Sequence, residues 1–191
     1  DSVTQVLFSA TLVADVLPRV WRRNPDGALH SLEKLRRLTH GALAEMRTML
    51  LELRPGALIN TPLSELLAQL TEAITGRTGL PFQLFIEQTP SLPETVHTNF
   101  YRIAQEALNN VVKHAQANLV TVSLSAAPLT PDSTNESRKE VTLVIQDDGV
   151  GYSSAEVETD HLGIGIMRER AAAINATLSL QSQPGSGTEV T

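Results

Sequence analysis

Residues 144–151 read Val-Ile-Gln-Asp-Asp-Gly-Val-Gly, so that two acids and two glycines follow directly on a short apolar run. The apolar run predicts a buried strand, and the glycines allow the backbone to approach a flat ligand closely. The carboxylate of Asp147 at the strand end can accept a hydrogen bond from an exocyclic amine such as that of adenine. Because Asp-Gly is also the commonest turn dipeptide, this stretch taken alone indicates an ordinary turn equally well.

A second group of polar residues lies upstream, on a helix predicted from Glu94 to about Ala115. Glu106, Asn110 and Lys113 follow at spacings of four and three, which places them on one face of that helix. An amide oxygen can ligate Mg²⁺, a carboxylate can hold a metal-bound water, and an ammonium group can neutralise phosphate. An ordinary charged helix face has the same pattern, and this segment alone favours that plainer interpretation.

A third group lies downstream, where residues 161–170 read His-Leu-Gly-Ile-Gly-Ile-Met-Arg-Glu-Arg. Gly163 and Gly165 precede a helix predicted over residues 164–174, an arrangement that presents free backbone N–H groups to phosphate. The stretch is not a Walker A loop, because no Gly-Lys-Ser/Thr follows, and no strand leads into it as in a dinucleotide-binding fingerprint. The polar residues 152–160 before it are interpreted as a flap over the ligand, with a plain surface loop as the alternative.

Around these groups, helical and alternating patterns succeed one another from residue 57 to the end. Mixed elements with consecutive strands at the end predict an α+β fold in which helices pack on a sheet. The helices are expected at 62–75, 94–115 and 164–174, and the strands at 81–88, 119–125, 141–146, 178–183 and from 188, with a hairpin loop at 127–139.

The first 56 residues differ from the rest, because they contain only helical patterns. Helices are predicted over 1–23, with a kink near Pro18, and over 28–53, joined by the turn residues 24–27. Their apolar stripes are too wide for one hairpin to bury, so dimerisation into a four-helix bundle is expected, with packing on the second domain as the alternative. The predicted domains are therefore 1–56 and 57–191.

The amino-acid composition argues against several classes of function. The net charge of -6 and the scattered basic residues argue against nucleic-acid binding, and the absence of cysteine excludes disulfides, thiolate metal sites and cysteine nucleophiles. No unbroken apolar run approaches the roughly 20 residues that span a bilayer, and no signal peptide is visible. A cytoplasmic protein without membrane contact in this stretch is expected. Both ends look cut, so a sensor or membrane segment is expected upstream.

In their order and spacing, the three polar groups resemble the motifs of the sensor histidine kinases of two-component signalling. The resemblance is strongest to the subfamily whose response regulators carry a LuxR/NarL-type DNA-binding domain. Residues 106–114 match the N box of this family, 147–151 the G1 box, 163–165 with the following Met-Arg-Glu-Arg the G2 box, and 185–188 the late Gly-Thr element. The resemblance implies the Bergerat ATP-binding sandwich shared with gyrase-like ATPases, with ATP and Mg²⁺ as cofactors.

The resemblance also implies roles at the phosphate end of the nucleotide. Asn110 would ligate Mg²⁺ and Lys113 would contact phosphate, while Gly163 and Gly165 would let the lid close over the phosphates. Glu106 occupies the position that activates water in hydrolysing relatives, and in a kinase it would order the Mg²⁺ shell.

At the base end, Asp147 would bind the adenine amine, Gly151 would pack beside the base, and Thr188 would support the adenine site. His114 and Gly149 complete the nucleotide-binding residues that the resemblance implies.

The first five residues resemble the tail of the His-Asp-x-x-x-Gln motif of the same family, in which the phosphate-accepting histidine precedes the aspartate. Asp1 would then be the general base and Gln5, one turn later on the same face, would position water for dephosphorylation of the regulator. A helix N-cap is the plainer interpretation of Asp1. None of the five histidines stands at the acceptor position, so the resemblance implies that these residues alone do not accept phosphate.

The expected function is that of a homodimeric kinase core, which moves the γ-phosphoryl group of ATP to a histidine and then to an aspartate in the receiver domain of a response regulator. Dephosphorylation of the regulator is an accompanying activity. A gyrase- or chaperone-like ATPase is the first alternative, which Glu106 fits and the hairpin does not. A non-catalytic interaction module with a vestigial ATP-binding pocket is the second, and the complete set of pocket residues argues against it.

Overall fold

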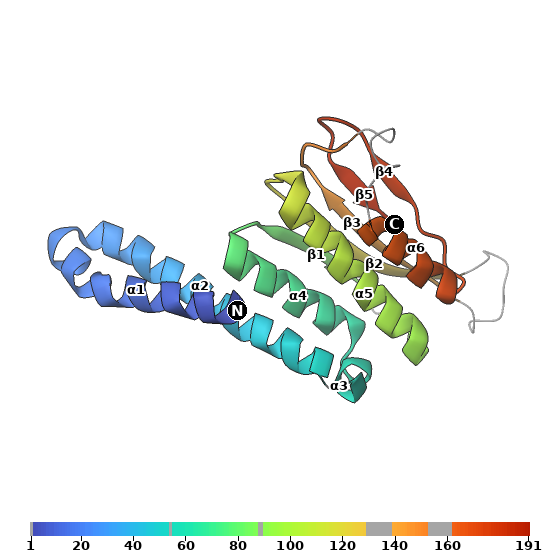
Figure 1. Cartoon of the computed structure of the whole chain (residues 1–191), viewed down its shortest axis with the longest axis horizontal. Helices are drawn as coiled ribbons and strands as arrows, with labels where there is room; N and C mark the ends of the chain where they lie inside the picture. The colour runs from blue at the N-terminus through green and yellow to red at the C-terminus, as the bar shows by residue number, and fades with distance from the viewer. Residues whose placement is uncertain (1, 54, 88–89, 129–138, 153–161) are drawn as a thin grey trace. The chain divides into compact units, whose positions relative to one another are not determined.

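The structure is a computed structural model that describes residues 2–53, 55–87, 90–128, 139–152 and 162–191 (Figure 1). Contacts within the chain group its residues into two compact units. The first unit comprises residues 1–58 and 68–79, and the second comprises residues 59–67 and 80–191. The predicted domain boundary at residue 56 stays a prediction, and each unit is described by itself below.

The first unit begins with a helical hairpin, as predicted. Helix α1 (Ser2–Arg23) is followed by α2 (Pro25–Leu53), with the single residue Asn24 between them. The side chain of Asn24 accepts a hydrogen bond from the Gly27 N–H at 3.0 Å, which caps the first turn of α2. Helix α2 therefore starts at Pro25, three residues earlier than expected, because proline is well tolerated in a first helical turn.

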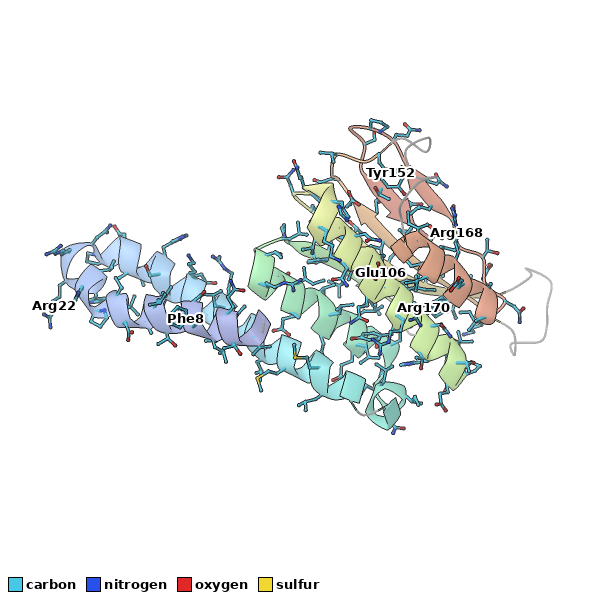
Figure 2. All side chains as sticks on the ribbon, in the orientation of Figure 1. Phe8, Arg22, Glu106, Tyr152, Arg168 and Arg170 are labelled. Carbon is cyan, nitrogen blue, oxygen red and sulfur yellow. The ribbon has the colours of Figure 1, made fainter. Side chains whose placement is uncertain are left out.

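Among the described residues, the hairpin exposes a wide apolar surface. Val6 and Ala10 of α1 and Ala28 and Ala42 of α2 are buried, but Phe8 is 64% exposed (Figure 2). The exposed large apolar side chains of the two helices are Leu7, Phe8, Leu12, Val16, Trp21, Leu29, Leu32, Leu43, Met46, Met49 and Leu50. Rows of exposed apolar side chains of this extent mark interaction surfaces.

Helix α1 is also long and apolar enough over residues 3–23 to cross a membrane, judged by length and composition alone. The sequence still contains no unbroken apolar run of that length, because Asp15 and Arg19 interrupt the apolar residues of α1. A helix of a bundle whose apolar face is covered by a partner has the same composition.

Two further helices follow the hairpin. Helix α2 ends at Leu53, within the expected range 53–56, but Pro55 opens a short helix, α3 (Pro55–Asn60), that sequence patterns did not indicate. Helix α4 (Leu63–Thr78) follows, and the predicted apolar positions Leu63, Leu66, Leu67, Leu70 and Ile74 are all buried. Within the first unit α4 approaches α2 closely, since a Cβ atom on either Gly41 or Gly76 would overlap the backbone of the other.

The second unit is a five-stranded sheet with helices α5 and α6 lying side by side over one face (Figure 1). The strands are β1 (Phe82–Ile86), β2 (Val120–Pro128), β3 (Lys139–Asp147), β4 (Leu180–Ser182) and β5 (Thr188–Val190), in the order β1-β2-β3-β5-β4. Strand β1 pairs in parallel with β2 because α5 crosses over between them, and the other pairs are antiparallel. This arrangement confirms the predicted helix-on-sheet sandwich.

The core of the second unit lies between the helices and the two long central strands. Val120, Val122 and Leu124 alternate along β2 and are fully buried, as the period of a strand requires. Strands β2 and β3 are longer than predicted, so the expected loop at 127–139 is shorter, and its residues 129–138 lie outside the described residues.

Helix α5 (Glu94–Asn110) does not continue as a regular α-helix to Ala115. Its last turn is a π-helix, η1 (Val111–Ala115), which Gln116 ends in the left-handed conformation with φ 50°. Helix α6 (Leu162–Ala173) closes the same layer. Single π-helical turns inside α-helices are frequent at functional sites.

Candidate functional site

A cavity of about 630 Å³ lies in the second unit, between the helix layer and strands β3, β4 and β5. Its wall brings together most of the residues that sequence patterns singled out, although they are separated by up to 82 positions in the chain, from Glu106 to Thr188. The predicted site residues on the wall are Glu106, Asn110, Lys113, His114, Asp147, Gly151, Gly163 and Thr188. A volume of this size falls within the range of small-ligand pockets.

The helical wall of the cavity comes from α5 and its π-helical turn. Glu106 and Asn110 belong to α5, whereas Lys113 and His114 belong to η1, and all four line the cavity. The carbonyl of Ala115 at the end of η1 accepts a hydrogen bond from the Val150 N–H at 2.8 Å. The π-helical turn therefore joins the polar helix face to the loop that follows β3.

The two adjacent acids after β3 have different roles. Asp147 is only 5% exposed and lines the cavity, and its carboxylate accepts hydrogen bonds from the N–H groups of Gly149, at 2.9 Å, and Thr188. Burial raises the pKa of Asp147, the two backbone hydrogen bonds offset part of this rise, and the charge of Asp148 adds to it.

Asp148 is exposed and does not line the cavity. Its carboxylate accepts hydrogen bonds from the N–H groups of Leu119 and Asn118, at 2.9 and 2.7 Å, and these bonds lower its pKa. Neighbouring residues of an extended chain point to opposite sides, so only one of the two acids can face a ligand. Asp148 instead ties the start of β2 to the end of β3.

Two glycines after Asp147 shape the loop in different ways. Gly151 lines the cavity with φ +59°, a conformation that residues with a side chain rarely adopt. Gly149 does not line the cavity, in contrast to the prediction that it contacts the nucleotide. A Cβ atom there would overlap the Ala115 carbonyl, so Gly149 is needed for the close approach of the loop to η1.

The glycines of the third group lie inside helix α6, not before it as expected. Helix α6 begins at Leu162, and Gly163 lines the cavity where a Cβ atom would overlap the carboxylate of Glu106. Gly165 is exposed and does not line the cavity. The first four N–H groups of a helix have no intrahelical acceptor, so the start of α6 still offers amides to an anion.

A hydroxyl network that sequence patterns did not indicate supports the other end of the cavity. The Tyr152 N–H donates to Ser182 Oγ at 2.9 Å, and Ser182 Oγ donates to the Gly187 carbonyl at 3.0 Å. Ser182 Oγ also lies 3.0 Å from Thr188 Oγ1. Burial raises the pKa of the Tyr152 hydroxyl, and the nearby charge of Arg168 offsets part of this rise.

The remaining wall of the cavity is apolar and suits a flat aromatic group. It is formed by Ala107, Val111, Ala115, Ile145, Ile164, Ile166, Met167, Leu180 and Val190. Figure 2 shows Glu106 on the helix layer and Tyr152 near β4 and β5, and both residues line the cavity. The only signal in the sequence for Tyr152 was its position directly after Gly151.

Gln5, predicted at the chain start, is not among the residues that line this cavity. Gln5 belongs to α1 of the first unit and its side chain is exposed. Asp1, the flap residues 153–160 and His161 lie outside the described residues.

The donor groups of the cavity fit a magnesium–nucleotide complex better than a metal ion alone. Within the described residues, no group of three or more histidine, cysteine, aspartate or glutamate side chains is close enough to hold a metal. Mg²⁺ commonly takes one or two protein oxygens, several waters and the phosphate oxygens of a substrate. Asn110 and Glu106 are the oxygen donors on the helical wall, and Lys113 provides a positive charge beside them.

Replacing Asp147 with asparagine is expected to stabilise the ligand-free protein at neutral pH. Burial raises the pKa of Asp147 above 3.8, so the folded state binds its proton more tightly than the unfolded state does. Ionised Asp147 therefore lowers the free energy of unfolding at pH values above the raised pKa. This destabilisation disappears as the pH falls through that pKa. Thermal unfolding should show a higher Tm for the variant at pH 7, and a difference that shrinks toward pH 4.

The comparison with Asp148→Asn is the matched control for this stability measurement. The pKa of Asp148 is lowered in the folded state, so its ionised form stabilises the fold above its unfolded pKa and the variant should lower the Tm at pH 7. If the two variants changed the Tm by the same amount in the same direction, the different roles of the two acids would be contradicted.

Comparisons with known proteins give matches along the whole chain. Residues 95–191 match the family described as histidine kinase-, DNA gyrase B-, and HSP90-like ATPase, and residues 1–58 match a family described as histidine kinase. Among curated proteins, the chain is 27% identical over 190 residues to the sensor histidine kinase LiaS of Bacillus subtilis (strain 168). It is 32% identical over 192 residues to the sensor protein VraS of Staphylococcus aureus (strain COL).

A third relative is the signal transduction histidine-protein kinase/phosphatase DegS of Brevibacillus brevis, which is 28% identical over 192 residues. The alignments cover 100% of this chain but only 50%, 51% and 47% of LiaS, VraS and DegS. The chain thus spans about half the length of the curated relatives it matches.

Two solved structures share the fold. The histidine kinase domain of the Erythrobacter litoralis EL346 blue-light activated histidine kinase aligns with a TM-score of 0.54 and 19% identity, covering 94% of this chain and 93% of that one. Full-length ShkA in complex with AMPPNP aligns with a TM-score of 0.52 and 20% identity, covering 86% of this chain and 35% of that one. The predicted fold class is confirmed by these likenesses together with the family match.

Proposed function

Because this chain belongs to the histidine kinases, within the family of histidine kinase-, DNA gyrase B- and HSP90-like ATPases, we propose that it is the ATP-binding and phosphotransfer core of a sensor kinase. The observation that carries the proposal is the convergence of Asn110, Lys113, Asp147 and Thr188 on one cavity. Membership of this family implies ATP binding. The resemblance to kinases that act with LuxR/NarL-type regulators is confirmed by the relatives.

In the proposed complex, the adenine ring lies on the apolar wall and its amine donates a hydrogen bond to Asp147. Asp147 is suited to this task because its two backbone partners, Gly149 and Thr188, orient the carboxylate toward the cavity. Gly151 allows the backbone to pass beside the base, and the Thr188 hydroxyl supports the same end through Ser182. His114 lines the wall near the sugar and phosphates as a further polar contact.

At the phosphate end, Asn110 would supply a neutral oxygen to Mg²⁺ and Glu106 would order the waters around it. Bound Mg²⁺ would neutralise charge on the transferred phosphoryl group and hold its oxygens in place. Lys113 would contribute a further positive charge to the phosphates, and the first-turn amide of α6 at Gly163 would donate to them. Catalysis would then rest on positioning and charge neutralisation, as expected for phosphoryl transfer.

The acceptor in this proposal is a histidine directly before Asp1. Its imidazole nitrogen attacks the γ-phosphorus, the bond to the bridging oxygen breaks, and ADP leaves while Asp1 takes the imidazole proton. The phosphoryl group then passes to an aspartate in the receiver domain of a response regulator. Gln5, one helical turn after Asp1, would position the water that dephosphorylates that regulator.

The exposed apolar face of α1 and α2 supports a homodimer formed through the hairpin, in which a four-helix bundle covers this face. No nucleic-acid partner is proposed, because the net charge of the chain is -6. The proposed location of the core is the cytoplasm, without direct membrane contact, and the rest of a longer protein could anchor it to a membrane.

Calorimetric titration with ATP and Mg²⁺ tests the proposal directly. One binding site per chain is expected, with a Kd in the micromolar range, or about -8 kcal/mol. Absence of binding would support the non-catalytic alternative and overturn the proposal. Steady ATP hydrolysis that disappears in Glu106→Ala would instead favour the gyrase- or chaperone-like ATPase.

Placing a histidine directly before Asp1, together with the native upstream helix, is expected to yield an acid-labile, alkali-stable phosphorylated chain from ATP and Mg²⁺. The physical reason is that the new imidazole then directly precedes the proposed general base Asp1, which would take its proton during the attack. The measurement is incorporation of labelled phosphate, with alanine at the new position as the control. A chain that binds ATP but never incorporates label would contradict the roles proposed for Asp1 and Gln5.

A further inference from the structure

Ser182 on strand β4 is the centre of the hydroxyl network beside the nucleotide cavity, yet it does not line that cavity. Its Oγ atom has three partners, which are the Tyr152 N–H at 2.9 Å, the Gly187 carbonyl at 3.0 Å and Thr188 Oγ1 at 3.0 Å. Tyr152 and Thr188 do line the cavity. Ser182 can therefore influence a ligand in the cavity only through these neighbours.

The pairing of three strands places Ser182 in one row with two residues of the site. Thr188 on β5 pairs with Asp147 on β3 on one side and with Ser182 on β4 on the other (Figure 1). Directly paired residues of neighbouring strands project from the same face of a sheet, and Asp147 lines the cavity. The Thr188 side chain therefore lies on the cavity face, between the side chains of Asp147 and Ser182.

The protons of this network follow from the donors and acceptors present. A hydroxyl group has one proton to donate and two lone pairs that accept. The Tyr152 N–H can only donate, so it occupies one lone pair of Ser182 Oγ. The Gly187 carbonyl can only accept, so it receives the Ser182 proton. The contact between the two hydroxyl groups is then a hydrogen bond only if Thr188 Oγ1 donates its own proton to Ser182 Oγ.

The Thr188 hydroxyl therefore has no proton left for a ligand and can act toward a bound base only as an acceptor. The ionised carboxylate of Asp147, its neighbour in the row, also only accepts. Adenine carries an amine at C6, which donates, whereas guanine and hypoxanthine carry a carbonyl oxygen there, which accepts. Two neighbouring acceptors favour the amine and oppose the oxygen, because polar groups that lose their partners on binding reduce the affinity.

We propose that Ser182 is a positioning residue for the choice of base: by accepting the proton of Thr188, it keeps Thr188 an acceptor and so favours a base with an exocyclic amine over one with a carbonyl oxygen at the same position. This inference rests on the proposed function, which places the base beside Asp147 and Thr188. It goes beyond that function because Ser182 fixes the direction of a hydrogen bond without contacting the ligand. Without Ser182 Oγ, the Thr188 hydroxyl can rotate and donate to a carbonyl oxygen.

The test compares ATP with inosine triphosphate, whose base carries a carbonyl oxygen in place of the amine, by displacement calorimetry on the whole chain with Mg²⁺. Ser182→Ala is expected to lower the ratio of the inosine triphosphate Kd to the ATP Kd by at least about threefold, because the released Thr188 proton can bond to the oxygen. A purely structural loss of support for the loop would weaken both nucleotides alike and leave the ratio unchanged. A smaller fall in this ratio than the expected one would overturn the proposal.

Matched variants separate the role of the Ser182 hydroxyl from a general effect of the substitution. Ser182→Thr keeps the hydroxyl and should retain the ratio of the original chain. Ser125→Ala is the control, because Ser125 follows the buried Leu124 on β2 and therefore lies on the opposite face of the sheet, away from the cavity. In a chain that already carries Thr188→Val, Ser182→Ala should no longer change the ratio, since no Thr188 proton remains to be released.

The failure of this inference can be distinguished from the failure of the proposed function. A chain that binds neither nucleotide overturns both, whereas a chain that binds ATP but keeps its ratio in Ser182→Ala overturns only the role of Ser182. If Ser182→Ala fails to fold, Thr188→Val decides. This variant removes the acceptor and must lower the same ratio, and an unchanged ratio would overturn the proposal.

Discussion

Replacing Asp147 with asparagine is expected to weaken ATP binding by about 100-fold, which corresponds to about 2.7 kcal/mol. The carboxylate already accepts hydrogen bonds from the N–H groups of Gly149 and Thr188. An asparagine must use its amide oxygen for these two donors, so its NH₂ group would face the adenine amine, donor against donor. The substitution thus replaces a hydrogen bond to a charged group by a repulsive contact. Such a change accounts for a loss of about 2.7 kcal/mol in the free energy of ATP binding.

The neighbouring residue offers a matched control for this prediction. Asp148→Asn removes the same charge one position along the chain, but Asp148 lies outside the cavity wall and bonds to the Asn118 and Leu119 amides. Calorimetry with ATP should therefore give an affinity within about threefold of the original for this variant. If both variants lose affinity equally, a general charge effect explains the loss and Asp147 does not contact the base.

Replacing Asn110 with alanine is expected to remove the contribution of Mg²⁺ to the site and to slow phosphoryl transfer by at least about 100-fold. Asn110 is the last residue of α5 before the π-helical turn, and its side chain lines the cavity beside Glu106. A methyl group offers no oxygen to the metal. The affinity for ATP should then be the same with Mg²⁺ as with a chelator, whereas the original chain should bind more tightly with Mg²⁺.

Asn109→Ala is the control, because Asn109 precedes Asn110 on the same helix and does not line the cavity. Transfer rates are measured in the chain that carries a histidine before Asp1. An Asn110→Ala variant that retains the Mg²⁺ dependence shown by Asn109→Ala would exclude Asn110 as a ligand.

Much of the fold was predictable because its signals are local. The apolar spacing of α1, α2 and α4 and the alternation of β2 depend only on residues a few positions apart, and these elements are confirmed. Helix starts were less predictable. Pro55 opens α3, and α6 starts before Gly163, because first turns tolerate residues that are unfavourable in helix interiors.

Details of the site were harder to predict for a different reason. The sequence contains two equivalent acids, and only the hydrogen bonds of Asp148 to the start of β2 decide that Asp147 faces the cavity. The π-helical turn likewise depends on the loop bond from Val150 to Ala115, and the Ser182 network depends on the pairing of β4 with β5.

By itself, the sequence determined which segments are helices or strands, the division into a helical first part and a mixed second part, and the family. Periodicity and motif order, on which these conclusions rest, are properties of the chain alone. The tertiary structure decided which residues share one wall. Glu106, Asp147, Gly163 and Thr188 come from four different elements, and only the strand order β3-β5-β4 under α5 and α6 brings them together. It also left both ring nitrogens of His97 buried without a partner among the described residues, and such burial is a property of packing that no local pattern contains.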